Sequence, residues 1–351
     1  MSAKFREGDF IETRQGSIFD VKGLIHPPNR IIAFIRYFPS GAGKRKGRGV
    51  FYEKVYSLSR RYDWLRKNFP EYVVYDLISD EILCEVPVKD VRRHYRPIEA
   101  LRRLRKAESL DDLEREVLEM ASLLKSSAYI SWDAIGVSGS IMVGLHTLNS
   151  DIDLVVYGSK NCRKVYSTIE ELLKDSFCPL KLYSLNELKQ LFDFRSKDTF
   201  MSFEDFVAVE SRKVLQGKFM GKDYFIRFVK DWNEVDEKYG DVCYKNCGYA
   251  RIEATVVDDS ESIFTPCTYK IGNVKIVEGP KLEPIEEISS FRGRFCEQAK
   301  NGETVIAQGK VEHVMNRKRN HEYFRLLLGG KPSDYMILKR QITASKHAPE
   351  L

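Results

Sequence analysis

Apolar residues recur at helical spacing in several segments of the first two thirds of the chain. Four of them lie three or four positions apart between Leu58 and Phe69, and a proline follows, so a helix is predicted over 57–69. Two further segments begin with a serine and place an acid three residues later, as in a capping box; these serines are Ser109 and Ser202. The same spacing predicts helices over 110–124, 169–174, 185–192 and 202–215.

Runs of β-branched and aromatic residues predict strands around these helices. Residues 18–21 and 31–37 flank a His-Pro-Pro-Asn turn sequence, which indicates a hairpin. Residues 41–49 contain four glycines and four basic side chains, so we expect a flexible basic loop; the spacing differs from that of a phosphate-binding loop. Residues 86–106 are interpreted as a connector that enters a helix. Strand candidates in the middle of the chain are 135–137, 152–156 and 224–229.

The last third of the chain has short alternating runs separated by turn residues. Strands are predicted over 251–257, 264–271, 274–277, 291–295, 304–314, 323–328 and 335–338. Such spacing is typical of a β-barrel or a β-sandwich. We therefore divide the chain into a small α/β unit over 1–100, an α/β (α+β) core over 101–238 and an all-β, barrel-like domain over 239–351.

The composition is that of a globular protein. Of the 351 residues, 43% are hydrophobic and 31% are charged, which argues against a disordered or fibrous chain. Charges interrupt the apolar runs before they reach the roughly 20 residues of a membrane helix. The first 15 residues lack the apolar core of a signal peptide. We expect a cytoplasmic protein without a membrane partner.

The seven cysteines are scattered and odd in number, unlike those of a secreted disulfide scaffold. Cys243 and Cys247 form the only close pair in the sequence. No second pair completes four zinc ligands, so structural zinc is not expected.

Basic charge is concentrated near the N-terminus. Residues 1–108 contain 23 Lys and Arg against 14 Asp and Glu, and aromatic residues are interleaved around the basic segment 41–49. A second basic cluster, 316–321, is expected at a hairpin tip. Two such clusters on either side of a core indicate a nucleic-acid partner, and RNA is favoured because barrel-like domains often hold single strands.

One segment of the core combines residues that suit a metal-bound nucleotide. Gly139 and Ser140 follow a short apolar strand, and Asp151-Ile152-Asp153 leads into another. Residues two apart in a strand point to the same face, so the two aspartates project together and repel each other unless a cation lies between them. Hard oxygen ligands suit Mg²⁺ or Mn²⁺. A glycine allows the backbone to approach a phosphate closely, and a serine hydroxyl can donate to it.

The segment resembles the signature of the polymerase-β-type nucleotidyltransferase superfamily, which joins a Gly-Gly or Gly-Ser turn to an Asp-apolar-Asp strand. The resemblance covers about residues 109–231. The sequence around the motif is similar to that of stand-alone predicted nucleotidyltransferases of archaea. It implies a nucleotidyltransferase-like core in which Asp151 and Asp153 hold two Mg²⁺ ions. Gly139 and Ser140 would hold the β- and γ-phosphates of an NTP, with ATP as the expected nucleotide.

The superfamily usually places a third carboxylate on a later strand, and here its position is open. No acid lies within 224–229. Asp223 immediately precedes this run, and Glu253 lies on a later strand. Cations for the triphosphate are sought among Arg212, Lys213 and Arg227. His146 either stacks near the nucleotide or caps the short helix after Gly139.

The resemblance implies transfer of a nucleoside monophosphate from an NTP to a hydroxyl, with RNA as the expected acceptor. A protein hydroxyl is an alternative acceptor, as in antitoxin-like members of the superfamily. A degenerate core that only binds nucleic acid is a second alternative, because the third acid is not evident. A small-molecule acceptor is disfavoured by the basic segments.

Overall fold

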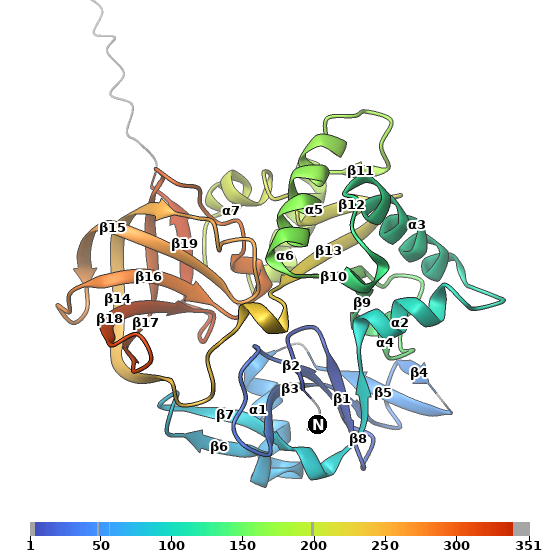
Figure 1. Cartoon of the computed structure of the whole chain (residues 1–351), viewed down its shortest axis with the longest axis horizontal. Coiled ribbons are helices and arrows are strands. Elements are labelled where there is room, and N and C mark those ends of the chain that lie inside the picture. Colours follow the sequence, from blue (N-terminus) through green and yellow to red (C-terminus); the bar gives the residue numbers. More distant parts are fainter. Residues whose placement is uncertain (1–3, 48, 56, 198–199, 340–351) are drawn as a thin grey trace, which may run out of the picture.

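The structure, a computed structural model, describes residues 4–47, 49–55, 57–197 and 200–339. Three β-sheets follow one another along the chain, so the fold is mixed α+β (Figure 1). In Figure 1 the N-terminal sheet lies at the bottom, the middle sheet at the upper right and a closed barrel at the left.

The N-terminal sheet has the strand order β4-β5-β3-β2-β1-β8, and β7 joins β3 to β6. Its strands are β1 (Phe10–Thr13), β2 (Ile18–Val21), β3 (Arg30–Pro39), β4 (Arg45–Gly47), β5 (Val50–Lys54), β6 (Val73–Asp76), β7 (Glu81–Pro87) and β8 (Val91–Tyr95). One face of the sheet packs on the helix α1 (Leu58–Asn68) through a cluster that includes Phe19, Ile35 and Leu65. The predicted β2–β3 hairpin and α1 are confirmed.

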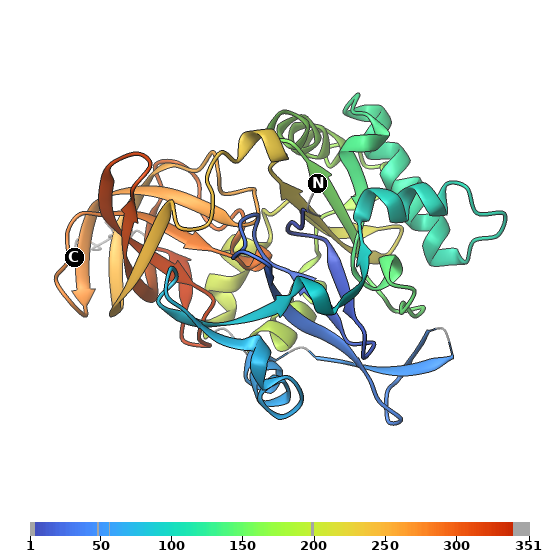
Figure 2. The same cartoon turned by 60° about the horizontal axis from the view of Figure 1, so that its bottom comes forward.

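Two predictions for this region are wrong. Residues 41–49 are not simply a loop, because β4 pairs with β5 and the two strands form a hairpin that extends from the edge of the sheet (Figure 2). The segment 86–106 does enter a helix as predicted, α2 (Pro97–Leu104), but the part before it is not a connector, because it contains β8, which pairs with β1. Basic residues of both segments therefore lie in ordered elements.

The middle sheet has the order β11-β12-β13-β10-β9, with β10 and β13 parallel. The elements of this region are α3 (Asp112–Ser127), β9 (Ile135–Val137), α4 (Gly139–Met142), β10 (Ile152–Tyr157), α5 (Ser159–Leu172), β11 (Leu180–Lys181), α6 (Leu185–Arg195), α7 (Phe203–Glu210), β12 (Gln216–Phe219) and β13 (Lys222–Val229). Ile152, Leu154 and Val156 enter the same hydrophobic cluster as α3 and α5, as the alternating pattern predicts.

Three helix boundaries differ from the prediction. The capping box of α3 is made by Asp111 with Glu114 rather than by Ser109, because the side chains of Asp111 and Glu114 bond each other's backbone N–H groups. α5 begins ten residues earlier than expected, directly after β10. α7 does have Ser202 as its N-cap but ends at Glu210, so the segment before β12 is not helical.

The C-terminal region is a closed five-stranded barrel, which confirms the barrel-like prediction. β14 (Val242–Asp258), β15 (Cys267–Glu278), β16 (Ile285–Ser290), β18 (His321–Leu328) and β17 (Thr304–Asn316) pair in that order, and β17 pairs back to β14. β19 (Tyr335–Leu338) adds to β17. The expected strand over 291–295 is wrong, because the strand β16 ends at Ser290 and a 3₁₀ turn, Gly293–Phe295, follows it. The expected hairpin tip over 316–321 is confirmed.

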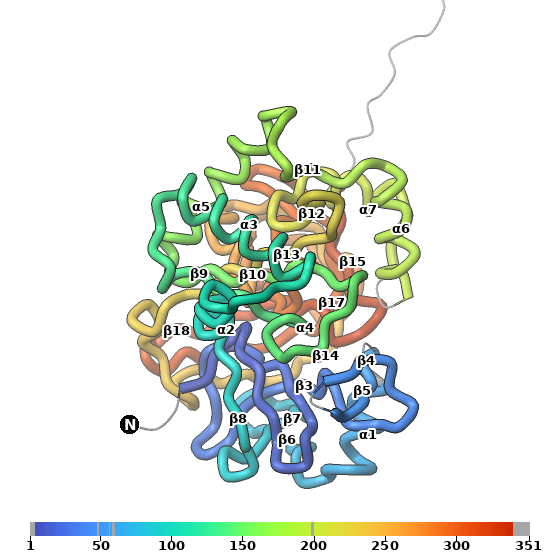
Figure 3. Tube along the Cα trace, turned by 90° about the vertical axis from the view of Figure 1, so that its right-hand side faces the viewer, coloured from blue at the N-terminus to red at the C-terminus, as the bar shows by residue number. Residues whose placement is uncertain are grey.

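The N-terminal sheet lies next to β9, β10 and α4 of the middle region (Figure 3). Phe10, Ile18 and Tyr37 are buried in the same cluster as β9 and β10. Ser138 Oγ donates a 2.7 Å hydrogen bond to the carbonyl of Gly8. The two units thus share a hydrophobic core along β10.

Short 3₁₀ turns link several elements; they are Pro70–Tyr72, Val88–Asp90, Trp132–Ala134, Trp232–Glu234 and Gly293–Phe295. All seven cysteines are free thiols. Among the described helices, none has both the length and the apolar composition needed to cross a bilayer.

Candidate active site

The Gly-Ser turn and the Asp-Ile-Asp strand meet at one point. Gly139 begins α4 with φ +63°, and an ideal Cβ at this residue would lie 1.9 Å from Oδ2 of Asp153. The backbone N–H of Ser138 donates to the carbonyl of Asp153 at 2.8 Å. Only glycine leaves room for this contact, so the two halves of the motif are one structural unit.

The two aspartates lie at the start of β10, on the face that does not enter the core. Asp151 is exposed and Asp153 is half-buried, whereas Ile152 and Leu154 on the other face are at most 1% exposed. Burial, and then the negative charge of Asp151, raise the pKa of the Asp153 carboxyl to about 6. Burial and the charge of Asp151 therefore disfavour the ionised form of Asp153.

Cations of the N-terminal sheet lie near this pair. The charges of Lys54, Arg36 and Arg227 all act to lower the pKa of Asp153. Lys54 ends β5 and Arg36 lies in β3, so both come from a unit more than 95 residues away in the sequence. Of the three cations expected from the sequence, Arg227 is the one that the structure brings to Asp153; it also forms an ion pair with Glu7.

The β4–β5 hairpin is held against the loop that connects the two halves of the motif. The Arg45 guanidinium donates to the carbonyl of Leu145 at 2.6 Å and to Ser150 Oγ at 3.3 Å. An ideal Cβ on Gly47 would lie 2.5 Å from Leu145 Cδ2. Figures 1 and 3 show β4 and β5 beside α4. The hairpin is thus part of the site.

The sequence analysis missed Arg36, Lys54 and Arg45. One signal was present: Arg36 is a single charge between Ile35 and Tyr37 in an apolar strand, and both neighbours are buried. A charge on the less buried face of such a strand faces either water or another polar group. Nothing in the sequence indicates that this group is Asp153.

Arg212 and Lys213 are not brought to the aspartates. Arg212 forms a bidentate pair with Glu303 at 2.5 and 2.6 Å. Lys213 is 3% exposed and its Nζ lies 2.6 Å from Glu210 and 2.8 Å from Gln298. Their charges join the middle region to the barrel, so the expectation that they bind a triphosphate is not supported by this geometry.

Asp223 has the register of a third carboxylate but other partners. In the parallel β10–β13 pair, Asp153 is opposite Phe225. Asp223 lies two residues before Phe225, so the same register places it beside Asp151 and on the same face of the sheet. The Asp223 carboxylate lies 3.0 Å from Lys218 Nζ and accepts a hydrogen bond from Tyr183.

Glu253 lies in β14 of the barrel, where it pairs with Lys339 at 2.6 Å. The ion-pair partner of Glu253 is therefore a residue of the barrel rather than a group at the aspartate pair.

A group of three ligand atoms lies near the start of α3. His146 Nε2 is 2.7 Å from Asp111, and with Glu114 these residues offer ligand atoms within 4.8 Å of one another. Among the described residues this is the one such group of three, so Asp223 does not converge with Asp151 and Asp153. Because Asp111 and Glu114 form the capping box of α3, His146 extends the cap of α3 rather than that of α4.

Comparison with known proteins gives one informative match. The uncharacterized protein MJ1086 of Methanocaldococcus jannaschii is 33% identical to the chain over 348 residues, which cover 96% of this chain and 100% of the relative. No family model matches the chain. No solved structure matches it.

The raised pKa of Asp153 has a measurable consequence for stability. A carboxyl whose folded-state pKa lies above its unfolded value binds its proton more tightly when folded, so its contribution to stability is lost as the pH rises through about 4 to 6. We expect Asp153→Asn to raise the melting temperature at pH 7 and to change it little at pH 4.5, where the native carboxyl is already neutral. Calorimetry at both pH values measures this. An equal shift of the melting temperature at both pH values would contradict the raised pKa of Asp153.

Proposed function

The chain belongs to the same protein family as this Methanocaldococcus jannaschii protein, and we propose that it is a Mg²⁺-dependent nucleotidyltransferase of the polymerase-β type. It would transfer a nucleoside monophosphate from an NTP, with ATP as the first nucleotide to test, to a hydroxyl of RNA. The observation that carries the proposal is the contact between Gly139 and the carboxylate of Asp153. This contact joins the two halves of the motif on which the resemblance rests.

The residues present fit a divalent cation. Asp151 and Asp153 offer hard oxygen ligands. Burial and then the charge of Asp151 raise the pKa of Asp153, and a positive ion between the two carboxylates would offset their repulsion. Mn²⁺ could replace Mg²⁺ at such an oxygen site. When bound, the metal would polarise the phosphates and favour loss of pyrophosphate.

The other groups of the site have separate tasks. The backbone at Gly139 and Ser140 would hold the β- and γ-phosphates. Lys54 and Arg36 would add positive charge from the N-terminal sheet, in the role first expected of Arg212 and Lys213. In the reaction the acceptor oxygen bonds to the α-phosphorus, the bond to pyrophosphate breaks and the acceptor proton passes to a base. Asp223 is the candidate base.

RNA as acceptor is supported by the hairpin next to the site. Lys44, Lys46 and Phe51 are exposed there, and Lys46 Nζ lies 5.7 Å from the centre of the Phe51 ring. A cation beside an exposed ring suits a phosphate and a stacked base. Basic residues elsewhere have acidic partners: Arg92 pairs with Glu12, Lys318 with Asp236, and Arg319 with Glu237.

A second candidate, nucleotide binding without transfer, is favoured by one observation. Asp223 is engaged by Lys218 and Tyr183, and no third carboxylate among the described residues joins Asp151 and Asp153. Without a general base and a third carboxylate ligand for the metal, the protein would still bind the nucleotide but would transfer the nucleoside monophosphate slowly.

Labelled nucleotides separate these proposals. Each α-labelled NTP is incubated with the protein, Mg²⁺ or Mn²⁺, total RNA and a protein extract. We expect label from ATP in the RNA fraction. Label in protein instead would assign a protein hydroxyl as the acceptor. Nucleotide binding without any transferred label would favour the second candidate.

The role of Asp223 is tested in the same assay. Loss of a general base typically lowers a rate by about 10²–10⁴. We expect Asp223→Asn to transfer in this range more slowly while binding Mg-ATP normally. Glu253→Gln is the matched control and should transfer at the native rate, because Glu253 pairs with Lys339 in the barrel. A native rate in Asp223→Asn would remove Asp223 from the site.

A further inference from the structure

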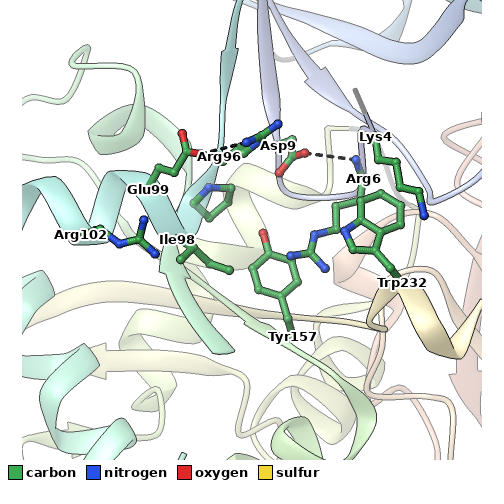
Figure 4. Close-up of a pocket in the computed structure, with 10 residues that line it drawn as sticks. Lys4, Arg6, Asp9, Arg96, Ile98, Glu99, Arg102, Tyr157 and Trp232 are labelled. Atoms are coloured by element: carbon green, nitrogen blue, oxygen red, sulfur yellow. Dashed lines mark hydrogen bonds and ion pairs between the residues drawn. The ribbon is translucent and has the colours of Figure 1, made fainter. Parts of the chain in front are cut away.

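A cavity of about 280 Å³ lies at the other end of β10, between the N-terminal sheet and α2 (Figure 4). Tyr157, its lining residue from β10, is six residues from Asp151, which is roughly 20 Å at about 3.3 Å per residue. Val155 is fully buried between the two sites and packs with Tyr157 and Ile98. The cavity is therefore separate from the candidate active site.

Tyr157 brings a hydrogen-bond donor without a partner to this cavity. The residue is 3% exposed, and its hydroxyl is buried with no hydrogen-bond partner. Burial raises the pKa of the phenol well above its usual range, so the hydroxyl keeps its proton and can donate. Because an unsatisfied buried hydroxyl is costly, this group favours a ligand that accepts a hydrogen bond.

The first turn of α2 adds backbone donors. Its N-cap residue, Arg96, makes no side-chain cap bond, and Pro97 has no N–H. The N–H groups of Ile98 and Glu99 therefore lack an intrahelical acceptor, and both residues line the cavity. Such N–H groups, together with the positive end of the helix, attract an anion.

The charge of the lining is positive. Four cations and two acids face the cavity. One acid, Asp9, is engaged by His94 Nε2 at 2.8 Å and by the backbone N–H of Arg6 at 3.2 Å. The other, Glu99, is paired with Arg96 at 2.9 Å. The remaining positive charge is available to a ligand.

The other three cations are held to different degrees. Lys4 forms no ion pair with a described residue and lies 5.3 Å from the centre of the Trp232 ring. Arg6 stacks on Tyr157, with 3.5 Å between the guanidinium carbon and the ring centre, and pairs with Asp231 at 3.2 Å. Arg102 pairs with an acid that is mostly exposed. An exposed pair such as that of Arg102 is weak in water and can yield to a bound anion.

We propose that this cavity binds a small phosphate monoester. Its phosphate would accept hydrogen bonds from Tyr157 and the first turn of α2 and lie near Arg6, while its organic part would lie near Trp232. The volume lies near the lower end of the roughly 300–1,000 Å³ of small-molecule pockets, which suits a small ligand. The proposal does not depend on nucleotidyl transfer, because it uses none of the residues of the first site.

Calorimetric titration of the whole protein with ribose 5-phosphate and, separately, with inorganic phosphate tests the proposal. Mg²⁺ and NTP are omitted, and chloride keeps the ionic strength constant. We expect saturable binding of ribose 5-phosphate, tighter than that of inorganic phosphate, with a change in Trp232 fluorescence that is absent in Trp232→Phe. No saturable heat with either compound would overturn the proposal, as would binding of inorganic phosphate alone.

A pair of matched variants locates the site. A hydrogen bond to a charged group contributes enough that Tyr157→Phe should weaken ribose 5-phosphate binding at least about tenfold. Tyr129→Phe, at an exposed tyrosine, should bind as the native protein does. Asp153→Asn should also bind normally, which separates this site from the first. Native affinity in a folded Tyr157→Phe variant would reject the assigned donor.

Discussion

Asp151→Asn and Asp153→Asn are each expected to lower nucleotidyl transfer by at least about 10³-fold. Each change removes one negative charge from a pair that would hold the metal, and metal-ion catalysis contributes several kcal/mol, with about 1.4 kcal/mol for each factor of ten. The fold should persist, because Asp151 is exposed and the strand is anchored by Ile152 and Leu154 on its opposite face.

The measurement combines initial rates of transfer with titration of Mg²⁺ in the presence of ATP. Asp193→Asn is the matched control, since Asp193 is exposed on α6 and the same charge is removed far from the motif in sequence. Both site variants should lose the metal-dependent step, and the control should keep it. Unchanged metal affinity and rate in folded site variants would show that the pair does not hold the metal.

Short-range patterns predicted the parts of the site that lie within one segment. The alternation in Asp151-Ile152-Asp153 places two carboxylates on one face and apolar residues on the other, and the structure buries Ile152, Leu154 and Val156 accordingly. β9 has the bounds predicted for it. These results depend on the period of a strand and on local burial, which a sequence shows directly.

The cations near Asp153 could not be predicted in this way. Lys54 and Arg36 act on Asp153 because the N-terminal unit also packs on this face of β10, where an ideal Cβ on Gly8 would lie 3.2 Å from Val155 Cγ2. The glycine-rich segment before Lys54 has the composition of a flexible loop, yet β4 pairs with β5, and Arg45 bonds Leu145, 100 residues away. Contacts at such separation arise from packing between sheets and have no local pattern.

Arg212 and Lys213 illustrate the opposite error. Their position on the helix predicted over 202–215 suggested cations near a nucleotide, but the barrel provides their partners, Glu303 and Gln298. The helix was also expected to continue beyond Glu210, where it ends. A buried lysine needs a partner, and here its partners include a residue more than 80 positions later in the chain.

Gly139→Ala is expected to abolish metal-dependent transfer although it adds a single methyl group. The new Cβ would lie 1.9 Å from Oδ2 and 2.8 Å from Cγ of Asp153, so the carboxylate must turn away from its position or the turn must move. Either change separates the two halves of the motif. Alanine at a positive φ also costs roughly 1–2 kcal/mol, so the loss of stability must be distinguished from the loss of the site.

Gly144→Ala provides that distinction. Gly144 has φ +70°, close to that of Gly139, but an ideal Cβ there meets nothing within 4 Å. The two variants should therefore lose similar backbone stability, measured by chemical unfolding, while only Gly139→Ala loses Mg²⁺ binding and transfer. Because Gly144 belongs to the loop that connects the two halves, it also controls for disturbance of that loop. If both variants lose transfer equally, backbone strain in the connection explains the loss; if Gly139→Ala retains transfer, the close approach of Gly139 to Asp153 is not needed for it.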